Sequence, residues 1–401
     1  MSGTTARRLP TSPRRLLGPI SAFSGAHRTA TVIVGMALFS VIIFVGSAFP
    51  PLSYFQQQNA WLGAFVNAGV FVLLAMGLNI VIGMAGLLDL GYAAFFAFGA
   101  YLYALGASPF TGNHFPFLLL LFGGAFIAAV FGVVLGAPTL RLRGDYLAIV
   151  TLGFGEIVPI VFLNLEKYTQ GTNGIGGIDH PSILDYHFPG IDQVPYFILM
   201  SIVVTFVMVL NYRLQDSRIG RAWMAIREDE LAAAASGINT VTTKLLAFSL
   251  GATTAGFAGV LNAAKLTLVS PDQFLFTVSF TVLAAVVLGG MGNIWGVAIG
   301  AFVISIIQVV LLKQLNQFFD TVGVPIVKDI NFLQFQFLLY GLALVLMMLF
   351  RPEGLFPSQR RRRELHVAEE LGPAADEEIA GAMGEAPAGA EELGGASEEK
   401  A

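Results

Sequence analysis

Residues 60–82 read AWLGAFVNAGVFVLLAMGLNIVI and contain no acidic or basic side chain. They lie inside an uncharged run of 60 residues from Thr29 to Leu88, and a second uncharged run of 51 residues extends from Leu90 to Leu140. Because a helix needs about 20 apolar residues to cross about 30 Å of hydrocarbon, these runs predict several membrane-spanning helices. A transmembrane barrel would instead show alternating polar and apolar residues over about ten positions.

The composition agrees with this prediction. Of the 401 residues, 55% are hydrophobic and 12% are charged, whereas an ordinary soluble domain carries about 25% charged residues. A large soluble globule is therefore excluded. The absence of Cys excludes a disulfide framework, a Cys-ligated zinc site and a Cys nucleophile. We expect an all-α integral membrane protein, a polytopic bundle of about 8–10 transmembrane helices.

The candidate spans follow from the uncharged runs. They are 30–49, 60–82, 83–106, 117–137, 145–163, 196–212, 245–264, 274–290, 293–312 and 331–350. The glycine-rich turns at 83–86 and 289–292 carry no charge, so a pair of short spans and a re-entrant hairpin are both compatible with the charge pattern there. Ten, eight and six full crossings therefore fit equally well.

The distribution of Lys and Arg predicts the orientation. With a cytoplasmic N-terminus, 18 of the 22 basic residues lie in cytoplasmic segments and 4 lie outside, as expected for a protein of the cell (inner or plasma) membrane with both termini in the cytoplasm. We expect a disordered cytoplasmic segment at 1–28, a transmembrane domain at 29–356 and a disordered acidic cytoplasmic tail at 357–401. The basic residues act as membrane anchors, so nucleic-acid binding is not implied.

Two loops of the transmembrane domain stand out. The loop at 164–195 is the largest expected on the outside, and the segment 213–243 is the longest expected between spans in the cytoplasm. The second segment combines eight charges from Arg213 to Glu230 with an alanine run and then Gly237, which suits a left-handed helix stop. It is either an ordinary anchored loop or a docking helix for a cytoplasmic partner.

Two acidic residues interrupt the apolar segments. A charge at mid-membrane costs about 2.5–3.5 kcal/mol on insertion scales, so such groups face a cavity, a partner or a polar mouth. Asp89 lies near the expected cytoplasmic turn, where water could reach it. Glu156 lies deeper, directly after Gly153 and Gly155, and is a candidate for either the permeation pathway or a structural polar contact.

Other motifs argue for packing rather than catalysis. Small residues recur at four-residue spacing, which allows helices to approach closely: Gly251, Ala255 and Gly259 form one row, and Gly292, Gly296 and Gly300 form another. The glycines at 289–292 lack the Lys-Ser/Thr of a P-loop, so we predict that this chain does not bind ATP through one. The sequence contains no His-Glu-x-x-His or Gly-x-Ser-x-Gly motif, and a hydrolase is poorly supported.

Several strings together resemble a known family. They are GLN at 77–79, GMAGLLDLGY at 83–92, RLRGDYLAIVTLGFGE at 141–156, GTNGI at 171–175, GRAW at 220–223, REDE at 227–230 and VLGGMG at 287–292. In this order and spacing they resemble the LivM-type permease subunit of branched-chain amino-acid ABC importers, over roughly residues 60–356.

The resemblance implies a transporter subunit rather than an enzyme, with no cofactor of its own. It implies two cytoplasmic ABC ATPases that bind ATP, a second related permease subunit in a heterodimer, an external substrate-binding protein and surrounding lipid. The residues that it places in the ATPase-coupling loop are Gly220, Arg221, Arg227, Glu228, Asp229, Glu230, Ala232, Ala233 and Gly237. Glu230 lies one residue earlier than the importer pattern Glu-Ala-Ala-x-x-x-Gly requires, which puts its own role in doubt.

The candidates for the substrate pathway are Asn79, Asp89, Tyr92, Glu156 and Asn173. The same family is similar to permeases for urea, short amides or nucleosides, which is the main alternative. An ion-coupled secondary transporter, a passive channel and a structural membrane scaffold are further alternatives; the first lacks an obvious charged relay.

Overall fold

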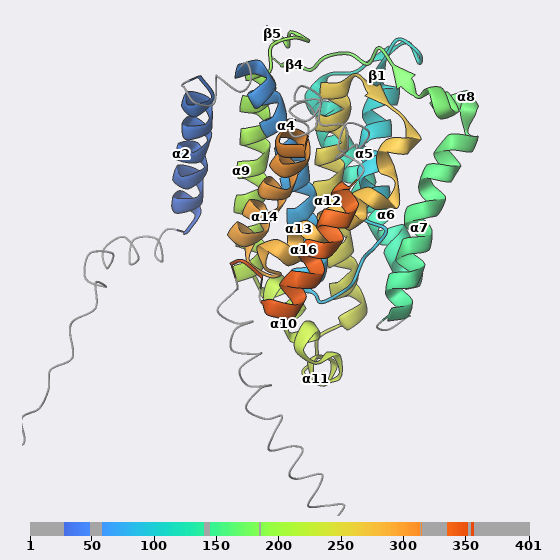
Figure 1. Cartoon of the computed structure of the whole chain (residues 1–401). Helices are drawn as coiled ribbons and strands as arrows, with labels where there is room; N and C mark the ends of the chain where they lie inside the picture. Colours follow the sequence, from blue (N-terminus) through green and yellow to red (C-terminus); the bar gives the residue numbers. More distant parts are fainter. Residues whose placement is uncertain are drawn as a thin grey trace, which may run out of the picture.

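A computed structural model describes residues 28–48, 58–139, 145–183, 186–312, 314, 335–351 and 354–356. Within these residues the chain is a helical bundle with short two-stranded sheets at one end, and α10 and α11 lie at the opposite end (Figure 1). The all-α membrane fold predicted from the sequence is confirmed. The expectations for residues 1–27 and 357–401 lie outside the described residues.

The elements follow one another in this order. The first half contains α2 (Arg28–Ala48), α4 (Gln58–Leu78), the π-helix η2 (Asn79–Met84), α5 (Ala93–Gly106), β1 (Ala107–Ser108), β2 (Asn113–His114), α6 (Phe117–Thr139), α7 (Asp145–Asn164), α8 (Glu166–Thr169), the 3-10 helix η3 (Gly171–Asn173), β3 (Ile175–Gly176), β4 (Ser182–Ile183) and β5 (Tyr186–His187). The second half contains α9 (Val194–Asp216), α10 (Arg218–Glu228), α11 (Glu230–Ala235), α12 (Thr240–Leu266), β6 (Leu268–Val269), the 3-10 helix η4 (Pro271–Phe274), α13 (Phe276–Gly289), α14 (Ile294–Ile306), the π-helix η5 (Ile307–Leu311) and α16 (Gln336–Phe350).

Every predicted span contains an apolar helix. Among the described residues, seven helices are long and apolar enough to cross a membrane, and three shorter apolar helices lie at 93–106, 294–310 and 336–350. The span predicted at 83–106 is wrong at its start, because the chain from 85 to 92 forms no regular helix. Gly86 has a φ of +72°, a left-handed conformation that ends the preceding helix.

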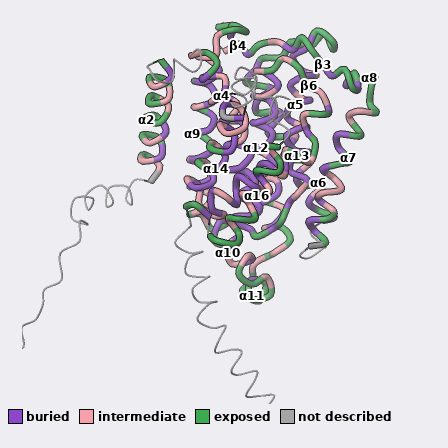
Figure 2. The backbone as a smooth tube through the Cα atoms, viewed as in Figure 1, coloured by how far each residue is buried: buried purple, intermediate pink, exposed green. Residues whose placement is uncertain are grey.

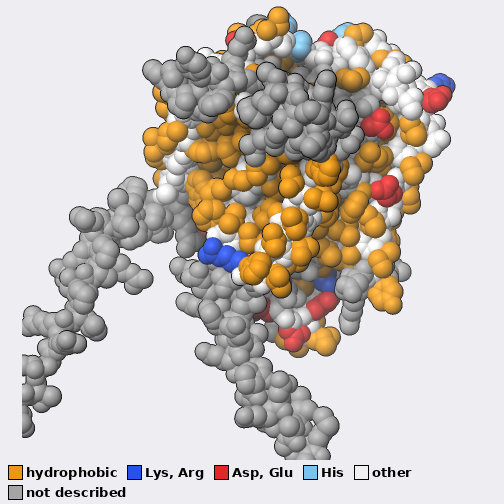
Figure 3. Space-filling model, in the orientation of Figure 1, with side chains coloured by type: hydrophobic (Ala, Val, Ile, Leu, Met, Phe, Trp, Pro, Cys, Tyr) orange, Lys and Arg blue, Asp and Glu red, His pale blue; other side chains and the backbone are white. Residues whose placement is uncertain are grey.

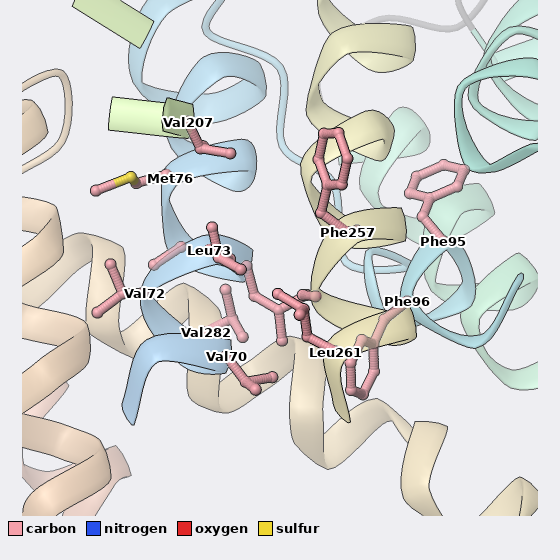
Figure 4. Close-up of a cluster of buried hydrophobic side chains, with 14 of the residues drawn as sticks. Val70, Val72, Leu73, Met76, Phe95, Phe96, Val207, Phe257, Leu261 and Val282 are labelled. Carbon is pink, nitrogen blue, oxygen red and sulfur yellow. The ribbon is translucent and has the colours of Figure 1, made fainter. Parts of the chain in front are cut away.

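The helices α4 and α12 form the centre of the bundle. α12 packs against α4, α5 and α6, and α4 also contacts α9, α13 and α14. Figure 4 shows the shared core, in which Leu73 and Met76 of α4 lie near Val207 of α9, with Phe257 of α12 and Phe96 of α5 further across. The buried positions of Figure 2 concentrate on these inner helices, whereas α2 at the edge is largely exposed or half-buried.

The outer surface of the bundle is apolar. Hydrophobic side chains cover much of the face seen in Figure 3, and large apolar residues are exposed along α2, α6, α9 and α16. In water such a surface would drive aggregation, but in a bilayer lipid tails cover it at no cost. Many of the hydrophobic residues that exclude a soluble globule therefore lie on the outer faces of the helices.

The sheets tie together the loops at the end opposite α10 and α11. Ile175 of β3 pairs with Val269 of β6, and the other two sheets are hairpins; all three pairs are antiparallel. The Asp179 backbone N–H donates to the Ala107 carbonyl at 2.7 Å, and the Asp179 carboxylate lies 2.5 Å from Nδ1 of His114. The long loop 164–195 thus folds back onto the end of α5.

Candidate functional site

The segment from α10 to α11 is a pair of short helices with defined ends. The Asp229 side chain caps α11 by accepting hydrogen bonds from the backbone N–H groups of Leu231 at 2.8 Å and Ala232 at 3.0 Å. The predicted left-handed stop at Gly237 is confirmed, with a φ of +86°. Among the residues proposed for coupling, Arg221, Glu228, Asp229, Ala232 and Gly237 are exposed, Arg227 and Glu230 are half-buried, and Gly220 and Ala233 are buried.

This segment is fastened to the start of α12. The buried Trp223 donates its indole N–H to the Thr243 carbonyl at 2.7 Å. Glu230 forms an ion pair with Lys244, with 2.6 Å between Oε1 and Nζ, and the Lys244 side chain is only 7% exposed. A buried pair is costly to break, because the remaining charge is left without compensation. Glu230 therefore has a defined structural partner, and sequence spacing carried no signal for Lys244.

Arg227 connects α10 to the broken end of the central helix α4. Its guanidinium donates a hydrogen bond to the carbonyl of Gly83, in the π-helix η2 that follows α4. The next turn packs directly on the same side chain, since a Cβ on Gly86 would lie 2.7 Å from Cγ of Arg227. These two contacts connect α10 to the point where the core helix ends.

Asn79 connects the end of α4 to the turn between α13 and α14. Its Oδ1 accepts a hydrogen bond at 2.8 Å from the backbone N–H of Gly292, in the turn between α13 and α14. Gly290 and Gly292 have φ values of +107° and +84°, so this turn needs glycine. Gln215, at the end of α9, donates to the Gly292 carbonyl at 3.4 Å. The π-helix η2 after α4, the turn between α13 and α14, and the junction of α9 with α10 thus form one hydrogen-bonded cluster.

The pathway candidates do not converge on one cavity. Asn79, Asp89 and Tyr92 are at most 2% exposed. The Tyr92 hydroxyl donates to the Gly251 carbonyl at 2.7 Å, and the Asp89 carboxylate accepts from the Gly91 N–H at 2.9 Å. Glu156 on α7 and Asn173 on η3 are exposed. Three candidates are therefore internal contacts and two lie on the molecular surface.

Replacing Asn79 with leucine should destabilise the protein by about 1–3 kcal/mol, because the partly buried Gly292 N–H loses its side-chain acceptor. Thermal unfolding in detergent would measure the loss. The matched control is Asn164→Leu, because that side chain makes only an exposed bond to its own helix at 2.8 Å. Equal unfolding temperatures for the two variants would contradict this prediction.

No metal site is evident in the described part of the chain. It contains no group of three or more His, Asp or Glu side chains placed to hold a metal ion. Instead, hydrogen bonds and an ion pair connect the short helices α10 and α11 to the ends of long helices in a multi-pass bundle. These features define a polytopic helical membrane protein.

The chain belongs to the family described as the branched-chain amino acid transport system permease component, whose pattern matches residues 61–350. It is similar to the high-affinity branched-chain amino acid transport system permease protein LivM of Escherichia coli, with 40% identity over 74% of this chain and 70% of that protein. The LivM protein of Salmonella typhimurium is 39% identical over 76% of this chain and 71% of its own length. The LivH permease of Salmonella typhimurium is 25% identical over 64% of this chain and 85% of that protein. No solved structure matches the chain.

Proposed function

We propose that this permease carries branched-chain, hydrophobic amino acids into the cell as one half of the pore of an ATP-driven importer. The observation that carries this proposal is the identity of about 40% to LivM proteins over about three quarters of the chain. A second, LivH-like permease would complete the pore, an external binding protein would deliver the substrate, and two cytoplasmic ATPases would supply the energy.

The segment 213–243 is the proposed receiver of that energy. α10 and α11 lie together at one end of the bundle (Figure 1). The proposal assigns this end to the cytoplasm, where the sequence also predicts both termini. Docked ATPases would move these helices, and the bonds from Trp223, Arg227 and Glu230 would pass the motion to α12 and to the end of α4. Alternating access then requires that substrate and nucleotide bind the two states with different affinity.

Reconstitution tests the proposal directly. The permease is purified with its copurifying partners and placed in proteoliposomes containing ATP or ADP, and labelled leucine is offered with the external binding protein. We expect uptake only with ATP. Uptake without nucleotide, or the absence of any ATPase from the purified complex, would overturn it. Competition with urea, an amide and a nucleoside would detect the alternative substrates.

Gly237→Val should weaken ATPase attachment. A left-handed backbone costs a residue with a Cβ about 1–2 kcal/mol, and no atom lies within 4 Å of the position where a Cβ would stand, so the strain is purely conformational. We expect valine to reduce the amount of ATPase that copurifies. Gly237→Asn, which tolerates this conformation better, is the control; full ATPase recovery with valine would remove this turn from the docking surface.

A further inference from the structure

The helix α7 carries an exposed carboxylate near the middle of its length. Glu156 stands in a helix of 20 residues that begins at Asp145, and at a rise of 1.5 Å per residue it lies about 16 Å along an axis of about 30 Å. Within the described residues its carboxylate has no hydrogen-bond or ion-pair partner. The bundle itself therefore does not explain this charge.

The rotation of α7 about its axis is set by its other side. Gly155 packs on Gly91, where a Cβ on Gly155 would lie 2.9 Å from the Gly91 Cα. The Thr151 hydroxyl accepts a hydrogen bond from the Leu90 N–H at 3.1 Å. This fastened side keeps Glu156 turned away from the helices that α7 packs against.

The exposed side of α7 combines apolar surface with free space. Ile149 and Ile160 are 63% and 52% exposed, and with Gly153 they share the helical face of Glu156 at spacings of three and four residues. A Cβ on Gly153 would meet no atom within 4 Å, so the volume one turn before the carboxylate is open. The face offers one negative charge among aliphatic side chains.

We propose that this face of α7 lines the passage of the substrate and that the Glu156 carboxylate receives the ammonium group of the amino acid at mid-membrane. This inference rests on the proposed function. A carboxylate that faces lipid is costly, and a cationic partner offsets that cost. A branched-chain amino acid supplies both the ammonium group and an aliphatic side chain, which fits Ile149 and Ile160.

The first test compares transport by Glu156→Gln, Glu156→Asp and the control Glu166→Gln in the reconstituted complex. Glu166 is also exposed and lies just beyond the same helix. We expect glutamine at 156 to lower kcat/KM for leucine about tenfold, as loss of a charge-assisted hydrogen bond predicts, with ATP hydrolysis retained. Aspartate should restore part of the rate and the control should match the unmodified protein.

The second test uses the absence of native cysteine. Gly153→Cys should react with a hydrophilic thiol reagent, and leucine should slow the reaction. Ile42→Cys, 67% exposed on the peripheral helix α2, is the lipid-facing control and should not react.

The outcomes are separable. Unchanged leucine kinetics in Glu156→Gln would overturn this inference. A Gly153→Cys variant that does not react with the reagent but cross-links to the second permease would also overturn it, and would assign the face to a subunit interface. If the unmodified complex transports no branched-chain amino acid, the proposed function itself fails.

Discussion

Arg227→Ala is expected to lower ATP-driven uptake about 10- to 100-fold while ATP hydrolysis by the complex continues, because a hydrogen bond from a charged donor is worth about 1.5–3 kcal/mol. The Arg227 guanidinium is bonded to the carbonyl of Gly83 at the break after α4. If motion of α10 reaches the core through this bond, its loss separates hydrolysis from transport. The measurement is the ratio of leucine imported to ATP hydrolysed in proteoliposomes.

The control for this prediction is Arg218→Ala, which removes an exposed arginine from the first turn of the same helix. It should leave the ratio unchanged. Arg227→Lys should recover part of the coupling, because lysine keeps the charge but not the geometry of the guanidinium. A normal ratio in Arg227→Ala would show that the force passes through Trp223 or the Glu230–Lys244 pair instead.

Gly259→Leu is expected to prevent the accumulation of folded protein. A Cβ at this position of α12 would lie 2.7 Å from the Ala100 backbone nitrogen and would also strike the Phe96 carbonyl of α5. Overpacking of a core costs about 1–3 kcal/mol and sometimes more. Here the obstacles are backbone atoms, and α12 is also wedged against α6, where a Cβ on Gly256 would lie 2.6 Å from the Gly124 carbonyl oxygen. The helices cannot part on one side without losing contacts on the other.

Gly341→Leu on α16 is the matched control, since a Cβ there meets no atom within 4 Å. Leucine favours a helix by up to about 1 kcal/mol over glycine, so this variant should be as stable as the unmodified protein or more so. Detergent-solubilised yield and the midpoint of thermal unfolding would compare the two. Similar yields of Gly259→Leu and the unmodified protein would contradict the close packing of α5 and α12.

The rows of small residues show what sequence spacing can predict about helix packing and what it cannot. The spacing of Gly251 and Gly259 correctly predicted close helix packing, because one face of a helix recurs every three to four residues whatever its partner. The identity of the partner was not predictable. Gly251 packs on Val81 and the Gly77 carbonyl, whereas Gly259 packs on α5, and these contacts depend on how distant segments assemble.

The site residues divide in the same way. Gly237 was predicted as a left-handed stop because its requirement is local, and its φ confirms it. The proposed pathway residues were chosen because they are polar among apolar neighbours, but polarity does not distinguish an internal hydrogen bond from an exposed group. Asn79 and Tyr92 are internal contacts, while Glu156 is exposed.

The sequence by itself determined that the chain is a membrane protein and which segments form helices. It also determined the position of the charged segment that contains α10 and α11. These properties follow from runs of apolar residues and from local backbone preferences, which need no knowledge of distant contacts. Only the tertiary structure decided that Arg227 meets Gly83, that Asn79 meets Gly292 and that Lys244 meets Glu230. Within a bilayer the hydrophobic effect does not favour one helix face over another. Close packing and a few buried polar bonds therefore decide which helices contact each other.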